Sequence, residues 1–275
     1  MDKNKKIQLT NLAIKLRKKS LKMAFEAGRN GAHLGGGLSM VEIFAVLYGN
    51  IISVESKNAT DSLRDRVIIS KGHCVLPYYS VLNEFGFLCD KDIADFETNG
   101  SFLHGHATRN IDCGIEFSGG SLGLGLSYAV GVALAGKLNK LSYKVYVVVG
   151  DGECNEGIVW EAFMSAVHFK LDNLVVIIDH NKLQYDGNIS TIMNMGNLQT
   201  KMDAFGFHTI EVDGHDIEKL YNAFNQLTVE KPHAVIAHTI KGKGVSFMEN
   251  QKEWHHSVLS EEQYNQAMSE QPNEI

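Results

Sequence analysis

Five short runs of β-branched and other apolar residues constrain the fold of this chain more than any other feature. They occupy residues 66–70 (RVIIS), 144–149 (KVYVVV), 173–179 (NLVVIID), 208–212 (HTIEV) and 233–240 (HAVIAHTI). Continuous apolar runs of this length are typical of strands that are buried on both faces, as in a parallel sheet. Intervening segments, such as 156–170 and 217–227, carry apolar residues at helical spacing. The pattern predicts an α/β fold with a doubly wound, mainly parallel sheet flanked by helices.

The length and the charge of the chain limit its organisation and its partners. Its 275 residues suffice for one large α/β domain or two small ones, and no linker or internal repeat divides them. We therefore expect a single domain over residues 1–275, with a lysine-rich N-terminal helix and a polar C-terminal tail. The net charge of −6 argues against nucleic acid as the main partner.

The N-terminal basic residues are best explained as one solvated face of a helix, because Leu9, Leu12 and Leu16 form an apolar stripe at helical spacing. These basic residues are Lys3, Lys5, Lys6, Lys15, Arg17, Lys18, Lys19 and Lys22. Two of them interrupt the only candidate core of a signal peptide, and no apolar run could span a bilayer. We expect no membrane partner. The four cysteines form no CxxC pair, which predicts reduced thiols in a cytoplasmic protein.

Metal-binding side chains follow two of the predicted strands. Asp151, between Gly150 and Gly152, ends one run, and Asn181 ends the next run 30 positions later. One strand–helix–strand crossover fits this interval, so both side chains can face the same crevice beyond the carboxyl ends of the strands. A carboxylate and an amide oxygen suit Mg²⁺ or Ca²⁺, with substrate phosphates and water completing the coordination. The two glycines would let the backbone approach a phosphate closely.

This pattern resembles the transketolase family, in particular its N-terminal, diphosphate-binding half. The most specific stretches are GDGECNEGIVWEA (150–162) and NLVVIIDHNKLQYDG (173–187). Other stretches follow the family in order, namely GAHLGGGLSMVEI, SKGHCVLPYY, GSLGLGLSYAVGVALAGK, VDGHD and TIKGKGVSFMENQKEWHH. The resemblance runs from about Leu12 to His255 and implies the thiamine-diphosphate-binding fold.

The resemblance also implies roles for individual residues. Asp151 and Asn181 match metal ligands, and Leu183 matches a position that binds the metal through its backbone carbonyl. The residues expected to contact thiamine diphosphate are Gly120, Ser121, Leu122, Gly150, Asp151, Gly152, Glu153, Asn181, His73 and His255. Glu156 matches a buried glutamate at a subunit interface, which is thought to link paired active sites. The residues expected to act in catalysis are His33, His73, His106, His255 and Glu156.

The histidines can also be judged without the resemblance. Six of the twelve lie in glycine-rich or polar loops, where site residues concentrate: His33, His73, His104, His106, His255 and His256. A neutral imidazole can donate, accept and shuttle protons near physiological pH. A zinc site formed by His33, His73 and His106 is an alternative, although no HxxxH or CxxC spacing supports it.

Three positions depart from the family pattern, and all three are expected near the substrate channel. His104 stands where a small, rigid residue is usual, and Leu124 stands where glutamine is common. His256 replaces the glycine that usually follows the histidine at 255. None of the three belongs to the metal motif, so the cofactor motif is intact. The sequence does not identify the donor and acceptor sugars.

The family also implies a partner. Transketolases continue from the diphosphate domain into a pyrimidine-binding domain and a C-terminal domain, whereas this chain ends soon after EWHH. We therefore expect the N-terminal subunit of a split transketolase, completed by a separate C-terminal subunit in an α2β2 heterotetramer. The implied reaction transfers a two-carbon ketol unit from a ketose or ketose phosphate to an aldose acceptor.

Three alternatives remain at this point. The α-subunit of a 2-oxo-acid dehydrogenase shares the cofactor, but it usually has glutamine at the position of Glu156 and lacks the SKGH and EWH histidines. A nicotinamide-dependent oxidoreductase would need G-x-G-x-x-G, and Tyr128 occupies the place of the third glycine. A catalytically silent paralogue would keep the motif and lack turnover.

Overall fold

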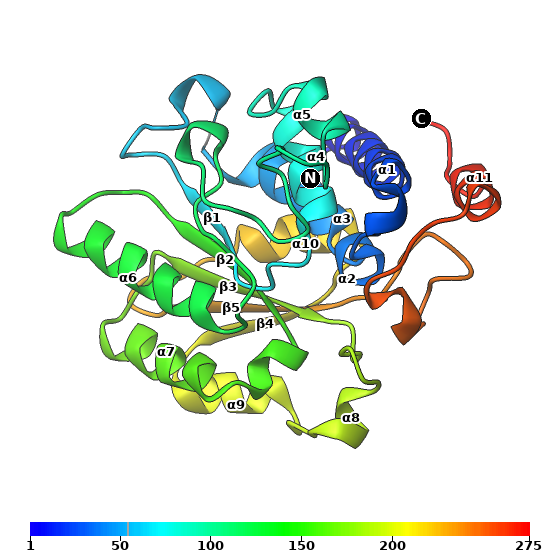
Figure 1. The fold of residues 1–275 in the computed structure, drawn as a ribbon. Helices are drawn as coiled ribbons and strands as arrows, with labels where there is room; N and C mark the ends of the chain where they lie inside the picture. Colours follow the sequence, from blue (N-terminus) through cyan, green and yellow to red (C-terminus); the bar gives the residue numbers. More distant parts are fainter. Residues whose placement is uncertain (54) are drawn as a thin grey trace.

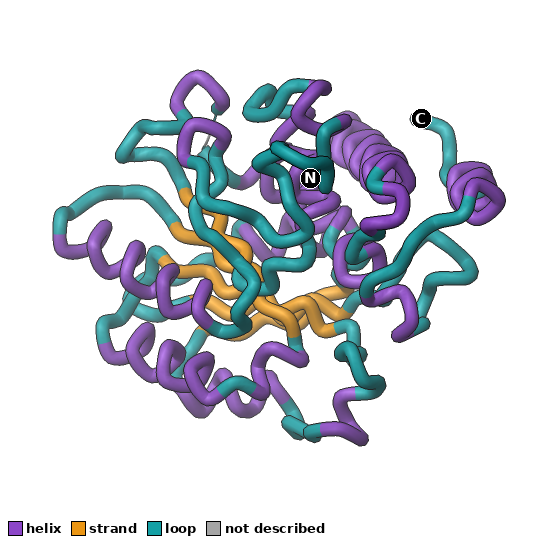
Figure 2. The backbone as a smooth tube through the Cα atoms, viewed as in Figure 1, coloured by secondary structure: helices purple, strands orange, loops and turns teal. Residues whose placement is uncertain are grey.

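In a computed structural model that describes residues 1–53 and 55–275, five strands form one parallel sheet. They are β1 (Arg66–Ile69), β2 (Val145–Gly150), β3 (Leu174–His180), β4 (His208–Asp213) and β5 (His233–His238). Their order across the sheet is β1-β2-β3-β5-β4. Figure 2 shows the strands as an orange layer inside the molecule. All five predicted strands are confirmed, and the observed bounds differ from the predicted ones by no more than two residues.

Burial on both faces explains why the central strands are apolar throughout. Every residue of β2 is buried, and in β3 only His180 is partly exposed. Successive side chains of a strand point to opposite faces, so Val147 and Val148 enter the two different cores of the molecule. β4 lies at one edge of the sheet, and Val212 is its one fully buried residue.

Helices cover both faces of the sheet, which confirms the doubly wound prediction. One face carries α6 (Leu124–Leu138), α7 (Gly157–His168) and α9 (Leu198–Phe205). The other face carries α1 (Lys3–Glu26), α3 (Val41–Val46), α4 (Val75–Glu84) and α10 (Ile217–Phe224) (Figure 1). Shorter helices are α2 (Leu34–Leu38), α5 (Asp90–Ala94) and α8 (Ile189–Ile192). The helices expected over 156–170 and 217–227 are therefore α7 and α10.

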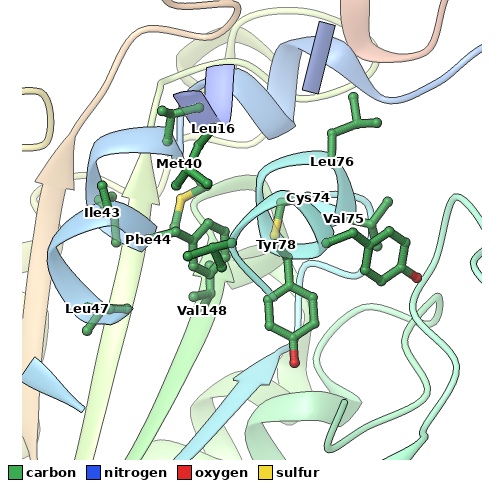
Figure 3. Close-up of a cluster of buried hydrophobic side chains, with 14 of the residues drawn as sticks. Leu16, Met40, Ile43, Phe44, Leu47, Cys74, Val75, Leu76, Tyr78 and Val148 are labelled. Atoms are coloured by element: carbon green, nitrogen blue, oxygen red, sulfur yellow. The ribbon is translucent and has the colours of Figure 1, made fainter. Parts of the chain in front are cut away.

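The larger core lies between the sheet and the helices α1, α3 and α4. Figure 3 shows Phe44 of α3, Tyr78 of α4 and Val148 of β2 in this cluster. The two ring centroids are 5.8 Å apart. Cys74 is buried in the same cluster, and all four cysteines are free thiols, as their spacing predicts.

The lysine-rich helix is confirmed as α1, with one correction. Its apolar stripe, including Leu9 and Leu16, is buried, and Lys3 and Lys15 face solvent. Arg17 does not belong to the solvated face, because it is only 7% exposed and pairs with Glu42 of α3. No helix in the described part of the chain is both long and apolar enough to cross a membrane.

The polar C-terminal tail is ordered by capping and by one aromatic contact. Ser260 and Gln263 form a capping box that starts α11 (Glu261–Ser269). Tyr264 of this helix stacks on Phe25 of α1, with ring centroids 4.3 Å apart. Figure 1 shows α11 beside α1, so the last segment of the chain returns to the first.

Candidate cofactor site at the carboxyl edge of the sheet

A pocket of about 390 Å³ lies where β1, β2, β3 and β5 end. Twelve of the residues predicted from the sequence line it: His73, His106, Gly120, Leu122, Gly150, Asp151, Gly152, Glu153, Glu156, Asn181, Leu183 and His255. Two predicted residues, His33 and Ser121, are not among the lining residues. The location agrees with the rule that open parallel sheets bind ligands beyond the carboxyl ends of their strands.

The register of the sheet brings the two predicted metal ligands together. Gly150 of β2 pairs with Asp179 of β3, so Asp151 and Asn181 follow the same edge of two neighbouring strands. Asp151 is 1% exposed and accepts hydrogen bonds from the backbone N–H groups of Gly152 (2.8 Å) and Lys182 (2.6 Å). Burial raises the pKa of this carboxyl, and a bound cation would favour its ionised form.

A left-handed backbone at Lys182 shapes the second half of this motif. Its φ is 66°, a conformation that costs a residue with a side chain of the order of 1 kcal/mol. The turn lets the Lys182 N–H reach Asp151 while the N–H of Leu183 donates to Oδ1 of Asn181 (3.0 Å). The left-handed turn therefore brings backbone N–H groups onto the side chains of Asp151 and Asn181.

Glu153 has a structural task besides lining the pocket. Its Oε1 accepts from the N–H of Gly123 (2.7 Å) and from the hydroxyl of Ser70, and its Oε2 accepts from the N–H of Gly150 (2.9 Å). The carboxylate thus ties the loop before α6 to the ends of β1 and β2. Its expected contact with the cofactor stays a prediction.

Two buried lysines in the pocket wall were missed by the sequence analysis. Lys71 and Lys241 are each 1% exposed. Lys71 pairs with Asp179 and donates to the carbonyl of Gly36 (2.9 Å). Lys241 lies 3.1 Å from Nδ1 of His255, and within the described residues it forms no ion pair with a carboxylate. Lysine is almost never fully buried without a counter-charge, but the sequence carries no signal that these two lysines are buried.

The sequence analysis also missed Asp179, a carboxylate beneath the pocket that accepts hydrogen bonds from four side chains. It accepts from Ser39 (2.8 Å) and Asn181 (3.0 Å), and also from Lys71 and Thr239. Burial raises the pKa of this carboxyl, but Lys71 and the hydrogen bonds outweigh burial and lower it. The segments after β1, β3 and β5 therefore meet at one ionised carboxylate.

The triple glycine in α2 allows a lysine and a histidine side chain to pass against its backbone. A Cβ at Gly35 would lie 3.0 Å from the Lys241 side chain and 2.8 Å from the carbonyl of Trp254. A Cβ at Gly36 would lie 2.9 Å from the ring of His73. The GGG stretch is thus explained by close approach at these positions.

The predicted histidines form one cluster beside the pocket. The ring of His33 lies 5.6 Å from His73, 5.0 Å from His106, 5.6 Å from His255 and 4.6 Å from His256, measured between centroids. Burial, followed by the neighbouring imidazoles, lowers the pKa of His33 to about 3. Its Nδ1 is buried and has no hydrogen-bond partner among residues 1–53 and 55–275.

The cluster does not have the form of a zinc site. Within the described chain, no group of three His, Cys, Asp or Glu side chains is arranged to hold a metal ion. Burial also lowers the pKa of His255 to about 3, with Lys241 the next cause, so this imidazole is neutral at physiological pH. The arrangement suits hydrogen bonding to a ligand in the channel.

The positions that depart from the family pattern lie in different places. His256 is exposed and packs edge-on against His33, at the outer side of the cluster. His104 is exposed and does not line the pocket, and its backbone carbonyl accepts from the hydroxyl of Tyr79 (3.0 Å). Leu124 is 46% exposed at the start of α6, also outside the pocket lining.

Glu156 was predicted to lie at a subunit interface, which stays a prediction. It lies at the start of α7, lines the pocket and is exposed in this chain. Ser121, also exposed, lies between two predicted residues at positions 120 and 122 that do line the pocket.

Known proteins share this fold. Residues 13–271 match the family described as transketolase, thiamine diphosphate binding domain. The chain is 41% identical over 258 residues to one of the subunits of the apulose-4-phosphate transketolase of Phocaeicola vulgatus, covering 93% of this chain and 91% of that protein. It is 36% identical over 267 residues to the 6-deoxy-6-sulfo-D-fructose transketolase subunit SqwG of Clostridium sp., covering 96% of each. The transketolase structure from Leishmania mexicana matches with a TM-score of 0.87 at 28% identity, covering 94% of this chain and 40% of that one.

Fold and pocket define an α/β domain with a ligand-sized pocket at the carboxyl edge of its sheet. The chain belongs to the transketolase family, in which it corresponds to the thiamine diphosphate-binding domain. It is a transferase subunit of the transketolase type, similar to the N-terminal subunits of split transketolases. The family membership confirms the resemblance seen in the sequence and sets aside the oxidoreductase and 2-oxo-acid dehydrogenase alternatives.

Proposed function

We propose that the pocket binds thiamine diphosphate through Mg²⁺ or Ca²⁺, with Asp151, Asn181 and the backbone carbonyl of Leu183 as the metal ligands. One carboxylate and two neutral oxygens leave room for phosphate oxygens and water, which is how Mg²⁺ is usually held. The observation that carries the proposal is that Asp151 and Asn181 meet at neighbouring strand ends, beside two buried lysines.

The charges of the pocket fit an anionic group. Lys71 is neutralised by Asp179, but Lys241 has only an imidazole as its polar partner in the described structure. Burying an unpaired charge is costly, and a diphosphate would supply the missing counter-charge. The other residues proposed to contact the cofactor are Gly120, Ser121, Leu122, Gly150, Gly152, Glu153, His73 and His255.

The histidine cluster is proposed to bind the sugar substrate through hydrogen bonds. Bound thiamine diphosphate supplies an electron sink for breaking a carbon–carbon bond beside a carbonyl. His33, His73, His106 and His255 lie close enough to one another to form hydrogen bonds with successive oxygens of one ketose chain. The proposed activity is transfer of a two-carbon ketol unit from a ketose or ketose phosphate to an aldose.

A second chain is proposed to complete the site. The two relatives named above are called subunits, and Glu156 at the pocket rim is exposed here. The helices α6 and α7, with the residue that follows α7, also expose apolar side chains: Leu124, Leu138, Met164 and Phe169. We assign Glu156 and α6 to the interface with a second polypeptide that carries the pyrimidine-binding and C-terminal domains, in an α2β2 assembly. A large obligate interface of this kind resembles a core cut in half.

Calorimetric titration of the assembled complex tests the metal motif. Asp151→Ala should abolish Mg²⁺-dependent binding of thiamine diphosphate, because it removes the only charged ligand of the proposed set. Asn181→Ala should weaken binding by more than the roughly 10–100-fold that the loss of an outer-shell partner costs. Asp203→Ala, an exposed carboxylate on α9, serves as the control and should leave affinity unchanged. Wild-type affinity in Asp151→Ala would exclude the metal site.

A further inference from the structure

We infer that Lys241 is a positioning residue that sets the tautomer of His255, so that Nδ1 accepts and Nε2 carries the proton. The geometry behind this assignment is one contact: Nζ of Lys241 lies 3.1 Å from Nδ1 of His255. An ammonium group has three donors and no acceptor, so the imidazole nitrogen that faces it must be the acceptor. In a neutral imidazole the proton then resides on the other nitrogen, Nε2.

The charges around the pair support the protonation states that the inference needs. Burial and then Lys241 lower the pKa of His255 to about 3, so the ring is neutral at pH 7. Burial and then Lys71 lower the pKa of Lys241 to about 8, with Asp179 and Asp151 acting in the opposite direction. Lys241 therefore remains mainly an ammonium at pH 7 and can only donate to its neighbour.

The packing around Lys241 leaves its side chain little choice of direction. The residue is 1% exposed, and its stem passes the Cα of Gly35, where any Cβ would lie 3.0 Å from it. The backbone N–H of Gly242 donates to the carbonyl of Gly35 (2.9 Å), which holds the two segments together. The Trp254 carbonyl lies against the same glycine, so the turn that carries His255 is part of the same contact.

A fixed tautomer decides what His255 offers to a ligand. With Nε2 protonated, His255 enters the channel as a hydrogen-bond donor, next to His73 at 4.8 Å between ring centroids. A donor placed in advance stabilises an oxygen on which negative charge develops during reaction. This consequence for the sugar rests on the proposed function, whereas the tautomer is a property of this chain alone.

Long-range ¹H–¹⁵N correlation spectra of the imidazoles test the inference on the full chain at pH 7, without cofactor. His255→Gln identifies the resonances of His255. The wild type should show an unprotonated Nδ1 and a protonated Nε2. Lys241→Met should shift the Nδ1 resonance towards the protonated range, as the two tautomers mix. Lys241→Arg should keep the wild-type pattern, because arginine is also a donor without an acceptor.

A pH titration provides the second measurement and does not depend on the methionine variant folding. Raising the pH through about 8 should give a mixture of both His255 tautomers in the wild type, because Lys241 then loses its proton. Lys241→Arg should stay unchanged over the same range, since the guanidinium keeps its charge. A protonated Nδ1 in the wild type at pH 7, or identical spectra of wild type and Lys241→Met, would overturn the inference. If the wild-type chain shows the expected tautomer but the wild-type complex does not bind thiamine diphosphate, the result would contradict the proposed function and leave this inference standing.

Discussion

His256 alone among the three departures from the family motifs reaches the histidine cluster. Residue 256 is held there by its neighbour, because Ser257 exchanges two backbone hydrogen bonds with Ala32 (3.0 and 3.1 Å). This bridge places the His256 ring 4.6 Å from that of His33. A glycine at the same position would leave the outer side of the cluster open.

We expect His256→Gly to change the choice of sugar and to leave cofactor affinity unchanged. The imidazole adds one donor or acceptor and the volume of a ring beside His33, and differences of this size are worth about 10–200-fold in kcat/KM between two substrates. The measurement is kcat/KM of the assembled enzyme for several ketose donors. His104→Ala is the matched control, since His104 is exposed like His256 but makes no ring contact with His33 in the described structure. Equal donor ratios in wild type and His256→Gly would contradict the assignment.

At the scale of the elements, a buried ion pair joins α1 to α3 and to the segment after β4. Arg17 pairs with Oε1 of Glu42, and Nδ1 of His215 lies 3.0 Å from its Oε2. The backbone N–H of Ile240 donates to Nε2 of the same histidine (2.9 Å). The contact fixes α1 and α3 on the sheet near the edge where the pocket lies.

This pair predicts a specific dependence of stability on pH. Burial raises the pKa of Glu42, but Arg17 and His215 outweigh burial and lower it to about 2, from 4.5. A carboxyl with a lowered folded-state pKa contributes stability above its unfolded pKa and loses it as the pH falls towards the folded value. The contribution of Glu42 should therefore be complete at pH 7 and smaller by about 1 kcal/mol at pH 4.

Urea unfolding of the chain at both pH values checks this prediction with Glu42→Gln. The variant should be about 3 kcal/mol less stable at pH 7, because Arg17 loses its buried partner. The difference in free energy of unfolding between wild type and variant should be smaller at pH 4. Glu26→Gln is the control, since Glu26 forms an exposed pair with Lys22 at 3.6 Å and should cost less than about 1 kcal/mol. An equal difference in free energy of unfolding between wild type and Glu42→Gln at both pH values would contradict the ionised state of Glu42.

At the scale of the whole molecule, α6 is half core and half surface. Its buried face includes Leu126 and Ala133. Its other face exposes Leu124, Gly131 and Leu138 to solvent. A Cβ at Gly131 would meet no atom within 4 Å, which makes this glycine unnecessary for the packing of the chain itself.

We expect the chain to be inactive alone and active with its partner subunit. Gly131→Leu should fold as well as the wild type, because leucine favours helix over glycine by about 0.8–1 kcal/mol, yet it should block a close-packed interface. Light scattering should then show the 2:2 complex for the wild type and separate subunits for the variant, with loss of ketol transfer. Ala204→Leu, exposed on α9, controls for added bulk. Robust ketol transfer by the chain alone, or assembly of Gly131→Leu, would contradict the proposed interface.

Much of the fold follows from local sequence patterns. The five apolar runs became five parallel strands, and the segments with helical spacing became α7 and α10. The position of Asp151 and Asn181 was also predictable, because a residue after a strand of a parallel sheet lies at its carboxyl edge. A single domain over residues 1–275 stays a prediction.

Other parts of the site required the folded chain. Lys71, Asp179 and Lys241 come from segments that are far apart in sequence, and no local pattern distinguishes a buried lysine from a solvated one. The same holds for Arg17, which was expected among solvated lysines and is buried instead. The environment of a charge depends on contacts between distant segments, which the order of residues does not display.

The sequence by itself determined which residues end the strands and which loops can approach one another, because apolar periodicity and glycine act locally. Only the tertiary structure decided which charges are buried and which imidazole faces which partner. Desolvation and hydrogen bonding depend on distances of a few ångströms between elements. Those distances exist only once β1, β2, β3 and β5 lie side by side with α2 packed across their ends.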